Sequence, residues 1–145
     1  MTTRTTPAGS ELGAAGPDAA VARLVHWLET GEGAEETFAS DCFLDLSLPQ
    51  WRIQSDTREA LVAVRRDGHP APGRVRVERV DRTGSGFVIA FEERWSAAGQ
   101  EWYCRELIRA DVAGGRITEL AAACTGDWDE EVQARHARDV SLLRP

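Results

Sequence analysis

The chain has 145 residues, of which 42% are hydrophobic and 28% are charged, and its formal net charge is −7. This length is typical of one globular domain with a single core, and the acidic balance argues against nucleic-acid binding, which needs clustered Lys and Arg. All 17 basic residues are Arg, so Schiff-base chemistry and the P-loop, both of which need a Lys, are excluded.

The cysteine and histidine patterns predict neither disulfides nor a metal site. The three Cys residues include no CxxC spacing, which indicates reduced thiols. The three His residues lie far apart in the sequence and match no metal-binding motif. No apolar run approaches the ~20 residues of a membrane span, and the N-terminus lacks the apolar core of a signal peptide. We therefore expect a cytoplasmic protein with no cofactor, no metal and no membrane partner.

The N-terminal part of the chain predicts a lead-in followed by helices. Residues 1–16 are rich in Thr, Gly and Ala, a composition that predicts a disordered segment before a single domain over 17–145. Apolar residues at helical spacing predict a helix over 17–30. A shorter helix is expected over 34–39.

A strand and a further helix are expected next. The segment DCFLDLSLP alternates between apolar and polar residues, which predicts a strand that buries Leu44, Leu46 and Leu48. The segment 56–68 predicts a helix that begins with a capping box formed by Asp56 and Glu59.

The second half of the chain predicts an antiparallel sheet. Alternating segments separated by glycine-containing turns predict strands over 74–81, 86–97, 100–112 and 116–125. A helical tail over 127–143 is expected to lie against the domain. Helices followed by a run of strands are typical of the α+β class, with the helices on one face of the sheet.

The hairpin at Ala98-Gly99 carries two glutamates that are candidate acid/base residues. With a two-residue turn, alternation places on one largely apolar face Phe91, Glu93, Trp95, Trp102 and Glu106. Glu93 and Glu106 are then diagonal neighbours, ~5–8 Å apart. Carboxyl groups in apolar surroundings have raised pKa values, and two neighbouring acids push their pKa values apart, which can provide an acid and a base near neutral pH.

A structural interpretation of these glutamates remains open. A three-residue turn would place Glu93 beside Arg105 as an ordinary salt bridge. Glu106 could instead pair with Arg52 or Arg116. Neither alternative requires a pocket.

Other candidate site residues lie outside the hairpin. Trp51 and Arg52 are expected at the mouth of a pocket, where they stack on a substrate or hold an anionic oxygen; a packed Trp and a solvated Arg are the alternative. His136 lies on the apolar side of the tail and either binds substrate or is a packing residue. The acids that favour a helix start at the tail are Asp127, Asp129, Glu130 and Glu131.

The motifs FASDCFLDL, DTREALVAVRRDG and GRITELAAACTGDWD resemble the NTF2-like superfamily, and in particular its SnoaL-like and ketosteroid-isomerase-like branch, over about residues 17–129. The resemblance implies a cone formed by a curved antiparallel sheet wrapped around the N-terminal helices, with an apolar pocket and often a dimer. Members include isomerases, dehydratases, polyketide cyclases, epoxide hydrolases and non-catalytic binders, so the fold does not choose the activity.

The ketosteroid isomerase residues do not transfer to this chain. The position of the general-base aspartate corresponds to Leu46, and the catalytic tyrosine falls near Leu24. Arg52, Glu93 and Glu106 offer a charge set similar to that of the epoxide hydrolases.

These observations favour a cofactor-independent acid/base enzyme acting on a small, largely apolar, polyketide- or terpenoid-like metabolite. Cyclisation, isomerisation, dehydration and epoxide hydrolysis all remain open. Glu93 and Glu106 would be acid and base, Arg52 an electrostatic anchor, and the substrate-binding walls would comprise Trp51, Phe91, Trp95, Trp102 and His136. The alternative is a non-catalytic small-molecule-binding or dimerisation module. We expect a homodimer in either case.

Overall fold

The computed structural model describes residues 16–70 and 72–145, so the predicted segment 1–16 lies outside the described residues except for Gly16. The elements are α2 (Pro17–Thr30), α3 (Ala34–Thr37), β1 (Phe38–Leu48), β2 (Trp51–Ser55), α4 (Arg58–Gly68), β3 (Gly73–Arg82), β4 (Gly86–Ala97), β5 (Gln100–Ala113), β6 (Arg116–Cys124) and α5 (Glu130–Asp139). The predicted α+β class is confirmed.

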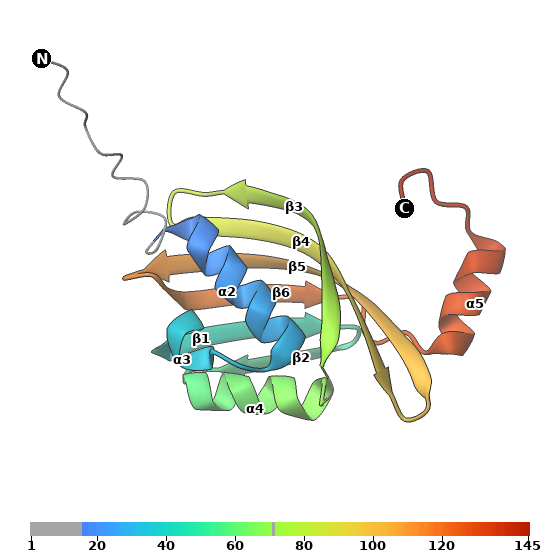
Figure 1. Cartoon of the computed structure of the whole chain (residues 1–145), viewed down its shortest axis with the longest axis horizontal. Coiled ribbons are helices and arrows are strands. Elements are labelled where there is room, and N and C mark those ends of the chain that lie inside the picture. The colour runs from blue at the N-terminus through green and yellow to red at the C-terminus, as the bar shows by residue number, and fades with distance from the viewer. Residues whose placement is uncertain (1–15, 71) are drawn as a thin grey trace, which may run out of the picture.

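The six strands form one curved sheet in the order β2-β1-β6-β5-β4-β3. Helices α2 and α4 lie on one face of this sheet, while α5 lies beyond the end at which the β4–β5 hairpin turns (Figure 1). The sheet is not wholly antiparallel as predicted, because β1 and β6 run parallel. The parallel pair arises because β6 returns to the middle of the sheet beside the first strand, after the chain has crossed to β3.

The core lies between α2 and the concave face of the sheet. Pro17 occupies the first turn of α2, and Gly31 ends the helix with a left-handed φ of 74°. The buried residues of α2 are Ala20, Leu24, Trp27 and Leu28. They pack in one cluster with buried residues of β4, among them Phe87 and Ile89. Each such large side chain contributes about 1.5–3 kcal/mol by leaving water.

The hairpin between β4 and β5 has the predicted two-residue turn. Ala98 and Gly99 have φ values of 53° and 76°, the pair of positive angles that a type I′ turn requires. The pairs formed across the hairpin include Phe91 with Glu106, Glu93 with Cys104 and Trp95 with Trp102. The predicted register is therefore confirmed, and the three-residue turn that would have placed Glu93 beside Arg105 is wrong.

Some local features at element ends differ from the predictions. Residues 51–55, of which Trp51 and Arg52 were expected at the mouth of a pocket, form edge strand β2. The N-cap of α4 is Thr57, which accepts a hydrogen bond from the Ala60 N–H, so the cap falls one residue after Asp56. The N-cap of α5 is Asp129, one of the acids expected at that helix start, and it accepts a hydrogen bond from the Val132 N–H.

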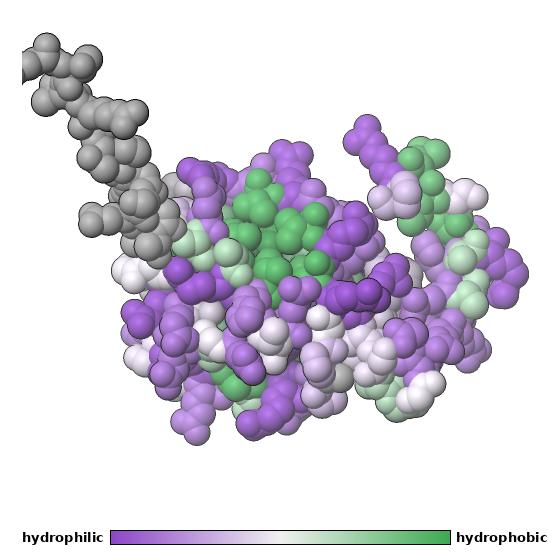
Figure 2. Space-filling model, viewed as in Figure 1, coloured by the Kyte–Doolittle hydropathy of each residue, from purple (hydrophilic) through white to green (hydrophobic). Residues whose placement is uncertain are grey.

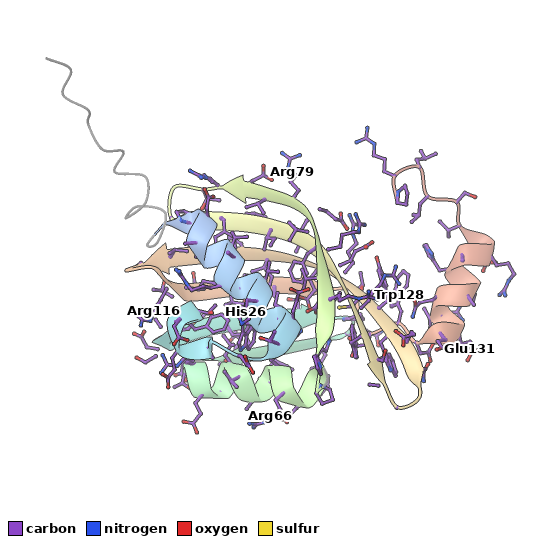
Figure 3. All side chains as sticks on the ribbon, viewed as in Figure 1. His26, Arg66, Arg79, Arg116, Trp128 and Glu131 are labelled. Carbon is purple, nitrogen blue, oxygen red and sulfur yellow. The ribbon has the colours of Figure 1, made fainter. Side chains whose placement is uncertain are left out.

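The C-terminal helix has little contact with the domain. No residue of α5 is buried, although the tail was expected to pack against the body. Glu130 and Gln133 form hydrogen bonds with the start of β5. Trp128, just before the helix, has its ring centroid 5.2 Å from that of Tyr103 and 5.0 Å from that of His136 (Figure 3).

The face of the molecule seen in Figure 2 is largely polar, with an apolar area beside α2 and β3. Val77 and Val80 of β3 are 40% and 37% exposed. Among the helices that the structure describes, none has the length and apolar character needed to cross a membrane.

Candidate functional site

A cavity of about 420 Å³ lies between helices α2 and α4 and the concave face of the sheet. This volume is within the range of small-molecule sites. Its apolar lining comes from α2 (Leu24, Trp27, Leu28), α4 (Leu61, Val64), β1 (Leu44, Leu46, Leu48), β2 (Ile53), β5 (Ile108) and β6 (Leu120, Ala122).

Polar side chains gather at one end of this cavity. Arg65 and His69 follow Leu61 at intervals of four residues, so α4 presents all three on the side that faces the cavity. Glu106 comes from β5, where its pairing with Phe91 sets it on the concave face. Asp127 follows β6. A mostly apolar cavity with a few convergent polar groups is the usual form of a ligand site.

Glu93 lies behind this polar end and is held by Arg65. Arg65 Nη2 donates to Glu93 Oε1 at 2.6 Å and Nη1 donates to Oε2 at 3.0 Å, while Nη2 also donates to the Leu28 carbonyl at 2.9 Å. Burial lowers the pKa of Arg65, but its bonds to Glu93 more than offset this, so the pKa is raised overall. Glu93 is 3% exposed, so this two-bond pair fixes the end of α4 to the sheet.

His69 connects two carboxylates at the same end of the cavity. Its Nδ1 lies 3.4 Å from Glu93 Oε2 and its Nε2 lies 3.1 Å from Asp127 Oδ1. The imidazole stacks on Trp95 with ring centroids 4.1 Å apart. These contacts fix the orientation of the ring, and Asp127, with a side chain 37% exposed, remains open to the cavity.

Glu106 is the acid whose protonation the site alters most. Burial raises the pKa of Glu106 well above its usual value, and the negative charge of Glu93 and contact with Cys124 raise it further, while Arg65 opposes the shift. The side chain is half-buried, because it lies deep in the molecule but lines the cavity. Its carboxyl group therefore keeps its proton to a higher pH than an exposed glutamate does, at a position where it can meet a ligand directly.

Two groups of three side chains have the donor atoms that a metal ion requires. The ligand atoms of His69, Cys104 and Asp127 all lie within 4.8 Å of one another, as do those of Cys104, Glu106 and Cys124. Both groups contain Cys104, so they form one continuous cluster. That the site works without a metal stays a prediction.

The structure brings some of the predicted site residues together. Glu106 lines the cavity, and Glu93 lies directly behind it with Cys104 Sγ 3.5 Å from Oε2. Trp95 supports His69 from behind, and Trp102 stacks on Trp95 at a centroid distance of 6.4 Å. Neither tryptophan lines the cavity, and neither does Phe91, which is fully buried in the core. The aromatic residue in the cavity wall is Trp27.

The remaining predicted residues lie elsewhere. Arg52 points to the outer face, where it pairs with Asp45 at 2.6 Å. Trp51 is 69% exposed at the edge of the sheet. His136 lines a separate groove of about 1070 Å³ between α5 and the outer face of the sheet. None of the three lines the cavity, because β2 continues outward as an edge strand and α5 stands away from the helical face.

Three residues of the polar end were not predicted to be site residues: Arg65, His69 and Asp127. The spacing of Leu61, Arg65 and His69 was a usable signal, since it places one Arg and one His on the apolar side of a helix. Asp127 was interpreted as part of a helix start, and no local pattern connects it with His69, which lies 58 residues earlier.

The cavity also explains why the isomerase pattern does not transfer. Leu24 and Leu46, at the positions of the tyrosine and the general base in ketosteroid isomerases, both line the cavity. The positions that carry the catalytic residues in ketosteroid isomerases therefore belong to the cavity wall here, but they carry apolar side chains. The adjacent acid, Asp45, lies on the outer face with Arg52.

No family model and no curated protein matches the chain. Among solved structures, it is similar to IdmH from Streptomyces antibioticus, named as a candidate polyketide cyclase (TM-score 0.59, 18% identity, covering 86% of this chain and 99% of that one). It is also similar to an LEH-like epoxide hydrolase from M. tuberculosis (0.60, 12%, 73% and 80%) and to an NTF2-like protein from Anabaena variabilis (0.60, 13%, 89% and 94%). The chain therefore has the NTF2-like fold.

Proposed function

We propose that the chain is a cofactor-independent acid/base enzyme of the SnoaL-like, ketosteroid-isomerase-like branch that acts on a small, largely apolar, polyketide- or terpenoid-like metabolite. The observation that carries this proposal is the Glu106 carboxyl group, whose pKa is raised and which lines the polar end of a mostly apolar cavity. A carboxyl group kept neutral near pH 7 can donate a proton or a strong hydrogen bond to a bound oxygen.

In this proposal the proton donor and the proton acceptor come from different elements of the fold. Glu106 on β5 protonates the substrate oxygen, and the Asp127–His69 pair accepts a proton from the neighbouring carbon or from water. Both groups lie at the polar end of the cavity. Proton transfer by a positioned side chain contributes about 10²–10⁴-fold, and the apolar walls hold the substrate in a reactive geometry.

Glu93 acts in this proposal as a positioning residue. It does not line the cavity, but it bonds to both Arg65 and His69, and its negative charge raises the pKa of Glu106. Arg52, predicted as an electrostatic anchor, is replaced in that role by Arg65, which lines the cavity.

In this proposal the structure of the substrate determines which reaction takes place. Cyclisation, isomerisation, dehydration and epoxide hydrolysis each need a proton delivered to an oxygen while another is removed nearby, and one neutral acid beside an acceptor pair serves all four. The similarity to IdmH and to an LEH-like epoxide hydrolase supports the substrate class.

Proton exchange tests this proposal without a known substrate. Bicyclic ketones and terpenoid epoxides are incubated with the protein in D₂O, and NMR follows deuterium entry beside the carbonyl and opening of the epoxide. We expect Glu106→Gln to lower the rate about 10²–10⁴-fold while ligand shifts remain. Glu131→Gln, on α5 outside the cavity (Figure 3), is the matched control and should match the wild type.

The alternative function is a non-catalytic small-molecule-binding or dimerisation module, which the predominance of apolar residues in the cavity favours. Ligand binding without exchange or epoxide opening in the wild type would support this alternative. Equal turnover by wild type and Glu106→Gln would remove Glu106 from the mechanism.

We also propose that the protein is a homodimer joined through the outer face of the sheet. On that face Leu107 is 52% exposed and lies between Ala90 and Ala123, its partners on the two neighbouring strands. This apolar row crosses three strands, and burying it against a second copy would remove it from water.

A further inference from the structure

Cys124 is the one thiol in the wall of the cavity. It ends β6 and is half-buried. Cys42 and Cys104 are fully buried, with no exposed surface. Any small molecule that enters the cavity can therefore meet the sulfur of Cys124 but not the sulfur of Cys42.

A backbone donor and two polar side chains surround the Cys124 sulfur. The Gly126 N–H donates to Sγ at 3.4 Å, and a left-handed φ of 81° at Gly126 turns the chain back after the strand ends. The Cys104 thiol, which donates to Glu93 Oε2, and the Glu106 carboxyl group lie within 4.8 Å of Sγ and within 4.8 Å of each other. A sulfur with a backbone N–H donor beside it is disposed to carry negative charge.

The charge distribution agrees with this geometry. Contact with Cys104 is the largest of the effects that together lower the pKa of Cys124 to about 7; burial opposes them, and the Gly126 N–H and Glu106 add to the lowering. The pKa of Cys104 is raised, first by its contact with Cys124 and then by burial. The thiolate form of Cys124 is therefore favoured beside a carboxyl group whose own pKa is raised.

A disulfide between the two neighbouring thiols does not fit the strand register. Cys124 lies opposite Glu106, so Cys104 is displaced by two residues along β5 and is a diagonal neighbour. Diagonal Cα atoms are about 7–8 Å apart, whereas a disulfide needs less than about 7 Å. The arrangement therefore favours two separate sulfurs over a bond between them.

We propose that Cys124 is a nucleophile that forms a thioether with apolar α,β-unsaturated carbonyl compounds in the cavity, and that Glu106 supplies the proton. This activity goes beyond the proposed acid/base function, with which it shares the cavity. The thiolate sulfur bonds to the β-carbon, the π electrons of the C=C bond move toward the carbonyl to give an enolate, and the Glu106 carboxyl proton passes to the α-carbon. No oxidant and no leaving group is required.

The rate of thioether formation by Cys124 at pH 7 can be compared with that of a free thiol. A thiol with a pKa of about 7 is half ionised, whereas a free cysteine with a pKa of about 8.5 is about 3% ionised. Because nucleophilicity falls with pKa, about fivefold of this gain is lost. The net gain over N-acetylcysteine is about threefold from ionisation alone, and binding of an apolar probe in the cavity adds to it.

The test is alkylation of the full chain by benzylideneacetone, an apolar α,β-unsaturated ketone, with acrylamide as a polar reference, followed by intact mass and peptide mapping between pH 5 and 9. We expect one adduct, on Cys124, with a rate midpoint near pH 7 and a preference for benzylideneacetone over acrylamide. Cys124→Ser should abolish the adduct and Cys42→Ser, which alters a fully buried thiol with a pKa raised to about 12, should leave it unchanged.

Two further variants examine the neighbours of Cys124. Cys104→Ala should move the rate midpoint toward the free-thiol value, and Glu106→Gln should slow the adduct at neutral pH, with circular dichroism used to verify folding. Adducts on Cys42 or Cys104 in place of Cys124, a midpoint near 8.5 in the wild type, or no adduct at all would overturn the inference. These outcomes leave the deuterium exchange by Glu106 unaffected, so failure here is distinct from failure of the proposed function.

Discussion

At the scale of single residues, two glutamates on the same face of one hairpin have opposite environments. Glu93 is buried but bonded to Arg65 through both oxygens. Glu106 lines the cavity and has a raised pKa because it is buried close to Glu93. One acid is thus ion-paired while its neighbour has a raised pKa, and two acids in such different environments are typical of acid/base sites.

The raised pKa of Glu106 predicts a pH-dependent stability. Protonation favours the folded state, so this stabilisation is complete below the unfolded carboxyl pKa of about 4.3 and is lost as pH rises through the higher folded pKa. Glu106→Gln removes the charge, so the variant should become more stable than the wild type as pH rises, by about 1.4 kcal/mol for each unit between the two pKa values. Urea unfolding from pH 4 to 9 measures this; parallel curves for wild type and variant would contradict it.

The sequence predicted half of this residue-scale arrangement. Strand alternation and the Ala98-Gly99 turn were enough to place Glu93 and Glu106 on one face, because both are local properties of a hairpin. The partners Arg65, His69 and Asp127 were not predicted, since their contacts depend on where α4 and the segment after β6 meet the sheet. Those contacts join residues 28 to 58 positions apart.

At the scale of elements, long segments with clear periodicity were predicted best. Helix α2 and strands β3 to β6 matched within a few residues, because each has a buried side that fixes its period. Strand β2 was missed because it has five residues, too few for its alternation of apolar and polar side chains to stand out. Helix α5 lies within the predicted segment 127–143 but is shorter, Glu130–Asp139, and its apolar side remains outside the core, which periodicity alone does not reveal.

Alternation along β6 predicts a matched pair of variants. Ala122 lines the cavity, whereas Ala123 is exposed on the outer face. Ala122→Phe should fill part of the cavity and weaken binding of apolar ligands at least about tenfold, with stability changed by no more than about 1 kcal/mol because the ring enters empty space. Ala123→Phe should leave ligand binding unchanged. Calorimetric titration with an apolar ketone, per chain, distinguishes them, and equal binding by both variants would show that the ligand lies elsewhere.

At the scale of the whole molecule, the two faces of the sheet differ, because helices cover one face and not the other. Helices α2 and α4 cover the concave face (Figure 1), and the cavity lies between them and the sheet. The outer face carries ion pairs such as Arg76–Glu92 and Arg105–Glu78, at 2.8 and 2.6 Å, around the apolar row centred on Leu107. A face with an apolar centre and a charged rim is typical of a protein–protein interface.

This arrangement predicts a dimer that a single substitution dissociates. Light scattering of the purified protein should give twice the chain mass of 15.9 kDa. Leu107→Glu should give the single-chain mass, because it places a charge at the centre of the interface, while leaving cavity ligands bound. A wild type that remains a single chain at high concentration would contradict the homodimer.

The central claim is that Glu106 is a neutral acid facing the cavity near neutral pH, and the most direct measurement is an NMR titration of the protein labelled with ¹³C at the glutamate carboxyl carbons. The account predicts one resonance that titrates well above all other glutamates, disappears in Glu106→Gln and shifts when an apolar ketone binds. If the resonance lost in Glu106→Gln titrates with the surface glutamates near pH 4.3, the acid/base account is wrong, and the cavity is better regarded as a binding site alone.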